Sequence, residues 1–366
     1  CTSLSETYNL MQTPKFPHSN SQSFHVELKK RVNDYFTKTG KQQTGGLRLF
    51  SKAAFLLTAF AVTYITLVFF TPSSIWAILL SVLLGALTAA IGFNVMHDGG
   101  HGSFSKYPIV NKFAASSAEV LGASHFMWNM KHNVIHHAYT NVDGVDDDID
   151  AKPILRMAAT QKKYKMHKFQ HLYFWIFYCL LYLYWTTMSD FRKYFAGRIG
   201  DIPLKKMTAK DHIEFWGFKL LHYSLFIVIP IIKLGVLNWL IGFLSFSVVA
   251  GFILSIVFQL AHTVEHTEFP VPDAVTGKLE DEWAIHQLKT TANFATKNRF
   301  ISWFVGGLNF QIEHHLFPKI SHIHYPKISK IIKEACKEYN VVYVEYARLD
   351  QAVASHVAFL KQMGRA

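Results

Sequence analysis

Long apolar runs alternate with polar, basic segments along this 366-residue chain. Three runs, Ala53–Phe70, Ile75–Phe93 and Trp239–Leu260, contain no Asp, Glu, Lys or Arg. A bilayer-spanning helix needs about 20 mostly apolar residues, and a fourth stretch at 215–233 comes close to that composition. The pattern therefore predicts an all-α integral membrane protein with four transmembrane helices, at about 53–70, 75–95, 215–233 and 238–260.

Two further apolar stretches are predicted not to cross the membrane. Residues 107–130 are interrupted by Lys112, Glu119 and His125, which favours a shallow or re-entrant segment. Residues 171–188 are short and rich in Tyr and Trp, which favours the membrane interface. If the histidine-rich segments 97–137 and 311–315 lie on one side of the membrane, an even number of crossings must separate them. Three apolar stretches lie between them, at 171–188, 215–233 and 238–260, so one does not cross. We take 171–188 to be that stretch.

The terminal segments are predicted to lie outside the bilayer. Residues 24–36, "FHVELKKRVNDYF", place Phe24, Leu28 and Val32 at helical spacing. This amphipathic helix lies at the membrane interface or packs against the cytoplasmic part of the protein. Residues 1–20 are expected to be loosely attached, and no cleavable signal peptide is expected. We divide the chain into an N-terminal segment (1–50), a membrane domain (51–330) and a helical tail (331–366).

The net charge of +12 is distributed in a way that predicts orientation. Eight Lys/Arg fall in residues 1–52 and nine in 97–170, whereas the connection Thr71–Ser74 has none. By the positive-inside rule, both termini and the basic segments face the cytoplasm. The distribution indicates membrane lipids as partners and no nucleic acid. The membrane would be the inner or plasma membrane in a bacterium, or the endoplasmic reticulum in a eukaryote.

Three histidine clusters stand out among the 20 histidines. "HDGGH" contains His97 and His101, "HNVIHH" contains His132, His136 and His137, and "QIEHH" contains Gln311, His314 and His315. Each cluster places residues at i and i+3 or i+4 on one helical face. Each doublet adds a histidine rotated by roughly 100°, which could serve a second metal ion. Because neutral imidazoles bind Fe, Zn and Cu, the clusters predict a site for two metal ions in a cytoplasmic helical cap. Gln311 is a weak ligand, a hydrogen-bonding neighbour of a ligand, or simply polar at the membrane boundary.

Other residues near these clusters are weaker candidates. The acidic run "DGVDDDID" (143–150), with Asp147 within it, and Asp98 could orient ligand histidines, although a solvated loop explains the run as well. Trp128, Asn129 and Trp303 flank the clusters and could line a substrate path or be packing residues. "HTVEH" at 262–266 matches a zinc-peptidase string with Glu265 as base, but it would use only His262 and His266.

The three ordered clusters resemble the histidine boxes of the membrane fatty acid desaturases, and the match covers roughly residues 50–330. The resemblance implies a non-haem di-iron centre, O₂ as co-substrate and a fatty acyl substrate, as acyl-CoA or acyl-lipid. It also implies one more histidine ligand near the cytoplasmic end of the last span. His262 is the favoured residue, and His266 is its rival.

The glutamine that opens the third box resembles the front-end branch, which inserts a double bond between an existing one and the carboxyl end. Many members of that branch carry a fused cytochrome b5 domain with a His-Pro-Gly-Gly motif. This chain has no such motif, so the resemblance implies a separate electron donor such as cytochrome b5, ferredoxin or rubredoxin. A hydroxylase of the same superfamily carries similar boxes and remains the alternative outcome.

Overall fold

The computed structural model describes residues 13–17 and 23–366, so most of the segment 1–20 lies outside the described residues. Within that part, four helices are long and apolar enough to cross a membrane: Leu47–Phe70, Ser74–His101, Ala209–Leu234 and Val236–His262. They confirm the four predicted spans. The segments 107–130 and 171–188 are not among them.

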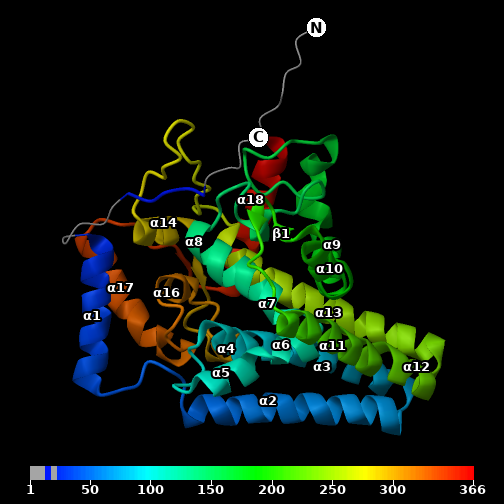
Figure 1. Cartoon of the computed structure of the whole chain (residues 1–366). Helices are drawn as coiled ribbons and strands as arrows, with labels where there is room; N and C mark the ends of the chain where they lie inside the picture. The colour runs from blue at the N-terminus through cyan, green and yellow to red at the C-terminus, as the bar shows by residue number, and fades with distance from the viewer. Residues whose placement is uncertain (1–12, 18–22) are drawn as a thin grey trace.

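Three of the four spans contain a π-helical turn. The first comprises α2 (Leu47–Ile65) and η1 (Thr66–Phe70), and the second α3 (Ser74–Ile91), η2 (Gly92–Met96) and α4 (His97–His101). The third comprises α11 (Ala209–Tyr223), η7 (Ser224–Val228) and α12 (Ile229–Leu234), and the fourth is α13 (Val236–His262). Figure 1 shows α12 at one end of the molecule and α1, α14, α16 and α17 toward the other.

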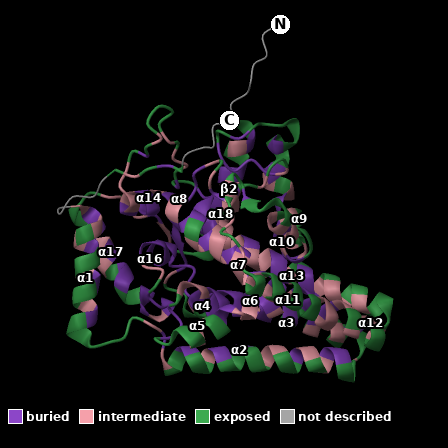
Figure 2. Cartoon of the chain, in the orientation of Figure 1, coloured by how far each residue is buried: buried purple, intermediate pink, exposed green. Residues whose placement is uncertain are grey.

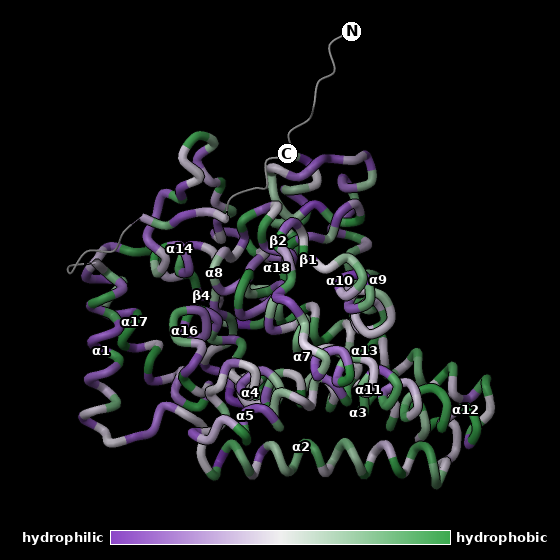
Figure 3. The backbone as a smooth tube through the Cα atoms, in the orientation of Figure 1, coloured by the Kyte–Doolittle hydropathy of each residue, from purple (hydrophilic) through white to green (hydrophobic). Residues whose placement is uncertain are grey.

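The outer faces of the spans are apolar and exposed, as expected of surfaces that contact lipid. Phe55, Val62 and Ile232 are examples of large exposed side chains on these faces. Figure 3 shows that hydrophobic residues predominate along α2 and α12, and Figure 2 shows the exposed residues there and the buried ones around α16. The inner faces pack closely. A Cβ at Gly85 would lie 2.4 Å from the carbonyl oxygen of Phe246, so only glycine lets α3 approach α13 here.

The cap at the opposite end is built from α1 (Phe24–Thr39), α14 (Trp283–Thr290), α16 (Gln311–Leu316) and α17 (Tyr325–Glu338). The apolar stripe of α1 is buried in a core with Leu288, Ile312 and Ile328. Of the two readings of residues 24–36, the structure therefore has the helix packed on the cap. The boundary proposed at residue 330 falls inside α17.

Shorter elements connect the spans to the cap. The helices are α5 (Pro108–Ala115), α6 (Ser117–Val120), α7 (His125–Trp128), η3 (Asn129–His136), α8 (His137–Tyr139), η4 (Asp147–Ile149), η5 (Lys165–Phe169), α9 (Gln170–Tyr184), η6 (Trp185–Ser189), α10 (Asp190–Ala196), α15 (Arg299–Phe304), η8 (His322–His324) and α18 (Leu349–Arg365). The strands are β1 (Arg198–Ile199), β2 (Ile202–Pro203), β3 (Asn293–Phe294) and β4 (Glu345–Tyr346). Strands β1 and β2 pair antiparallel, and β3 and β4 pair in parallel.

The C-terminal helix α18 is joined to the membrane core through His356. Its Nε2 lies 2.8 Å from the Tyr178 hydroxyl of α9, and its Nδ1 lies 2.6 Å from the carbonyl oxygen of Thr263, directly after α13. All three side chains are buried or nearly so. Burial lowers the pKa of His356 to about 4, because the imidazolium would lose its hydration.

We expect the folded protein to lose stability as the pH falls below 6.5. An unfolded histidine has a pKa of about 6.5, so between pH 6.5 and 4 the unfolded chain takes up a proton at His356 that the folded protein does not. The loss from this residue reaches about 3 kcal/mol. In thermal unfolding of the detergent-solubilised protein at pH 7.5 and pH 5, His356→Gln should show a smaller drop in Tm than the unsubstituted protein. An equal drop would contradict the assignment.

Candidate metal centre

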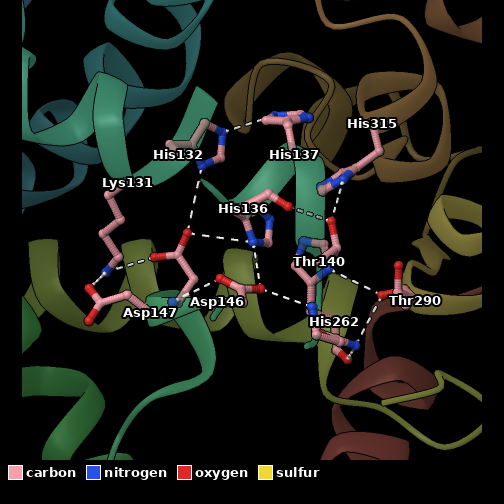
Figure 4. Close-up of polar contacts among 12 residues, drawn as sticks. Lys131, His132, His136, His137, Thr140, Asp146, Asp147, His262, Thr290 and His315 are labelled. Carbon is pink, nitrogen blue, oxygen red and sulfur yellow. Dashed lines mark hydrogen bonds and ion pairs between the residues drawn. The ribbon is translucent and has the colours of Figure 1, made fainter. Parts of the chain in front are cut away.

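The predicted histidines come from four separate parts of the chain and meet in one buried region. His97 and His101 lie on α4, at the end of the second span, and His262 is the last residue of α13. The second cluster lies on η3 and α8, and the third on α16. Figure 4 shows how His136, His262 and His315 point toward one another. The two spans and the cap therefore have to assemble before the site exists.

The ligand atoms form two groups that share no residue. His97, His101, His132 and His314 make the first group, and His136, His262 and His315 the second, with the atoms of each within 4.8 Å of one another. His137 forms a further group with His314 and His315, so it lies between the two. The doublet His314/His315 is divided between the two groups, as the angular separation of adjacent helical residues predicts.

π-Helical backbone positions the first two clusters. The turn η2 directly precedes His97, and η3 carries His132 and His136. The sequence spacing had suggested regular α-helix, whereas π-turns occur frequently at functional sites. The side chain of Asn133 on η3 donates to the carbonyl oxygen of Gly100 at 3.0 Å, which joins the second cluster to the first.

The inward-facing nitrogens fit metal ions. The Nε2 atoms of His101, His136, His262, His314 and His315 are buried without a hydrogen-bond partner. His132 Nε2 lies 3.3 Å from the Nε2 atoms of both His97 and His137. Buried polar atoms without partners are rare in proteins, and here they converge on common points. A donor set made almost wholly of imidazole nitrogen is suited to a transition metal.

The outward-facing nitrogen of His136 is held by a buried carboxylate. His136 Nδ1 lies 2.9 Å from Asp146 Oδ2, and Asp148 lies beside both His136 and His132. Such a contact fixes the tautomer and leaves Nε2 free to bind metal. Burial lowers the pKa of His136, but the charge and hydrogen bond of Asp146 and the charge of Asp148 together outweigh burial, and the pKa is raised overall.

Gln287 on α14 holds His315 in the same way. Its Oε1 lies 2.8 Å from His315 Nδ1 and also accepts from the Thr140 hydroxyl at 2.9 Å. Its Nε2 donates to the carbonyl oxygen of His137 at 3.2 Å. Sequence analysis did not identify Gln287, because "WAIHQLKT" carries no motif and only the fold brings α14 to the second and third clusters.

The electrostatics of the other histidines keep them neutral. Burial, reinforced by the neighbouring histidines, lowers the pKa of His137, His314 and His315 well below its ordinary value. Only neutral imidazole binds a metal ion. The region is thus arranged to present unprotonated nitrogen at neutral pH.

The acidic candidates are placed differently from expectation. Asp147 pairs with Lys131 at 3.4 Å and Lys193 at 3.0 Å and contacts no histidine, so the neighbours Asp146 and Asp148 fill the role suggested for it. Asp98 accepts from Ser321 and His322 at 3.0 Å each, so it holds the segment after the third cluster.

Gln311 and His266, two further ligand candidates, differ in their burial. Gln311 is buried, and its Oε1 has no hydrogen-bond partner. His266 is exposed, beyond the end of α13, with a φ of 71°. Glu265 is exposed as well. The "HTVEH" string therefore does not assemble a peptidase site, and His262, not His266, reaches the cluster.

The three residues suggested for a substrate path lie in different surroundings. The Trp128 ring stacks on His132 at 4.8 Å between centroids and packs in an apolar cluster with Met96, Ala118 and Ala123. Asn129 accepts from Asn133 beside the site. Trp303 is exposed on α15, under the ammonium group of Lys52.

Comparison with known proteins agrees with the site. A family model for fatty acid desaturases matches residues 73–347. The chain is 36% identical over 353 residues to the sn-1 linoleoyl-lipid 6-desaturase of Arthrospira platensis, and the alignment covers 96% of this chain and 95% of that protein. Identity is 33% over 362 residues to the enzyme of the same name from Synechocystis sp., with 98% and 100% covered. It is 34% over 357 residues to an acyl-lipid (8-3)-desaturase of Physcomitrium patens, with 96% and 74% covered.

Proposed function

This chain belongs to the fatty acid desaturase family, and we propose that it is a front-end desaturase that acts on an acyl chain of a membrane lipid at a di-iron centre, with O₂. The observation that carries the proposal is the set of buried, unpartnered imidazole nitrogens that converge in two groups. The glutamine of the third box and the acyl-lipid names of the relatives support the front-end, lipid-linked form.

Each iron would be held by one of the two groups. His97, His101, His132 and His314 would hold one ion, and His136, His262 and His315 the other. His137 lies between the groups, and Gln311 offers a buried side-chain oxygen that has no hydrogen-bond partner. When bound, the metal pair supplies with O₂ the oxidising power that side chains lack. The acyl chain loses two hydrogens, and two electrons and two protons from outside complete the reduction of O₂ to two waters.

A small apolar cavity of about 30 Å³ lies beside the metal region, and in this proposal it forms one part of the path of the acyl chain. One wall is a face of the second span, made by Thr88, Gly92 and Met96, the last directly before His97. Leu254 of α13 also lines the cavity. Trp128 packs both on this region and on His132, so it joins the cavity to the metal groups. Apolar walls exclude water from the chain and present its methylene groups to the site.

In this proposal the electrons come from a separate carrier. Cytochrome b5, ferredoxin and rubredoxin are the classes to test. The basic segments indicate that the cap and both described ends of the chain face the cytoplasm, where these carriers reside. The enzyme would work in the inner or plasma membrane of a bacterium or the endoplasmic reticulum of a eukaryote.

The test is product analysis with the purified protein in nanodiscs. A linoleoyl lipid and the matching linoleoyl-CoA are supplied separately, with reduced ferredoxin and O₂, and iron is measured per chain. We expect two irons and a lipid product lighter by two hydrogens, with its new double bond on the carboxyl side of the existing ones. A parallel reaction without O₂ is the control.

Three outcomes would contradict parts of this proposal. A product heavier by one oxygen would mean hydroxylation, which the relatives' names do not favour. Conversion of linoleoyl-CoA alone would overturn the lipid-linked substrate. A protein that is active with zinc in place of iron would overturn the di-iron assignment.

A further inference from the structure

A buried ion pair lies beside the apolar cavity, within the apolar part of the molecule. Lys219 of the third span and Asp190 at the start of α10 are 2.8 Å apart (Nζ to Oδ2), and the two residues are 3% and 0% exposed. Desolvating two charges costs several kcal/mol each, and packed apolar residues stabilise such a position as well or better. An ionisable residue in a membrane span therefore indicates a functional role.

Both charges hold backbone and side-chain groups of other elements. Asp190 Oδ2 accepts from the backbone N–H of Ser124 at 2.7 Å, and Asp190 Oδ1 accepts from the indole N–H of Trp185 at 3.1 Å. Lys219 Nζ donates to the carbonyl oxygens of Gly122 at 2.6 Å and Thr186 at 3.3 Å. The pair thus joins the turn at 121–124 to η6.

These are the elements that form the cavity wall opposite the second span. Leu121 and Ala123 line the cavity from the turn, and Trp185 and Thr186 line it from η6. Tyr182, another lining residue, donates to the carbonyl oxygen of Leu121 at 2.8 Å.

The turn itself has little room to move. Gly122 has a φ of 92°, and a Cβ there would lie 2.6 Å from His222 Nε2. Leu121 and Ala123 flank Gly122 and Ser124, the residues whose backbone Lys219 and Asp190 hold, so the contacts of the pair bear directly on the part of the turn that lines the cavity.

We propose that the Lys219–Asp190 pair is a positioning device that sets the shape of this cavity wall and so determines which acyl chains the enzyme accepts and which carbons it dehydrogenates. The inference rests on the proposed function, since it takes the cavity to hold the acyl chain. Neither residue contacts the chain in this scheme. They act through Trp185 and the turn. A pair of apolar side chains would cost less to bury, but it would make no hydrogen bonds to hold these groups in one orientation.

The test is a competition between a linoleoyl lipid and an otherwise identical lipid whose chain is two carbons longer. The variant Asp190→Asn/Lys219→Met leaves no unpaired buried charge, removes the hydrogen bonds donated by Lys219, and leaves position 190 with one acceptor oxygen in place of two. We expect the ratio of the two products, or the ratio of double-bond positions, to change by about threefold or more. A full methylene group that fits or does not fit a tight apolar pocket changes the preference between two substrates by more than this, about 10-fold or more. Iron content should stay unchanged.

A matched control neutralises an exposed pair on the same helix, Lys210→Met/Glu214→Gln, and should leave both ratios unaltered. If the double variant folds and keeps the original ratios, the pair is merely structural and the proposal fails. If it does not fold, Trp185→Phe decides, because it keeps an aromatic ring in the wall but removes the hydrogen bond to Asp190 together with the pyrrole part of the indole. An unaltered ratio in Trp185→Phe would then overturn the proposal. If the unsubstituted protein makes no unsaturated product, the proposed function is contradicted instead.

Discussion

Replacing His315 by alanine is expected to remove at least one of two bound metal ions and to abolish desaturation. His315 belongs to the group with His136 and His262 and also to the group with His137 and His314, so its loss leaves no complete second set. The loss of activity should exceed the roughly 100-fold that removal of an outer hydrogen-bond partner costs. Iron per chain and product yield in nanodiscs are the measurements.

The matched control for this variant is His266→Ala, which removes an exposed histidine that lies four residues after His262. It should retain both metal ions and normal activity. Equal losses in the two variants would indicate a general effect on folding. A His315→Ala protein with two irons and normal product would refute the assignment of the second group.

The second large effect is expected at Gln287, which touches no metal in this scheme. Gln287→Leu removes the acceptor that holds His315 Nδ1 and leaves the Thr140 hydroxyl with one partner fewer. Loss of such a partner typically weakens metal binding 10- to 100-fold. Gln287→Glu keeps the acceptor oxygen and should recover part of the affinity. Iron retention during titration with a chelator measures the effect.

Gln362→Leu, at an exposed position of α18, controls for the loss of an amide elsewhere. The comparison of Leu with Glu at position 287 separates orientation of His315 from simple packing. If both Gln287 variants hold iron as firmly as the unsubstituted protein, the hydrogen bond to His315 has no role in binding.

The spans and the region of the site could be predicted because they depend on local patterns. Hydropathy over about 20 residues marks a membrane helix, and i, i+4 histidines mark a shared face. The doublets in particular indicated two ions rather than one. The choice of the additional ligand remained ambiguous, because it depends on the residue at which a helix ends. His262 and His266 are equivalent by spacing, and only the end of α13 at His262 separates them.

The partners of the ligands could not be predicted because they depend on tertiary contacts. Asp147 and Asp146 are indistinguishable in an acidic run, yet the N-cap of η4 at Asp146 turns that carboxylate toward His136. The pairing of Lys219 with Asp190, 29 residues apart, likewise has no sequence signal.

The position of His97, His101 and His262 at the ends of two membrane-crossing helices has a consequence for the lipid environment. A helix adapts to a bilayer thicker or thinner than its apolar length by tilting. Because α4, at the end of the second span, carries donors of the first group and α13 carries a donor of the second, a change of tilt between the two spans would move one donor set against the other. Hydrophobic mismatch is thereby coupled to the geometry of catalysis. An enzyme whose products alter the packing and thickness of the bilayer would then sense, through its own helices, the membrane that it modifies.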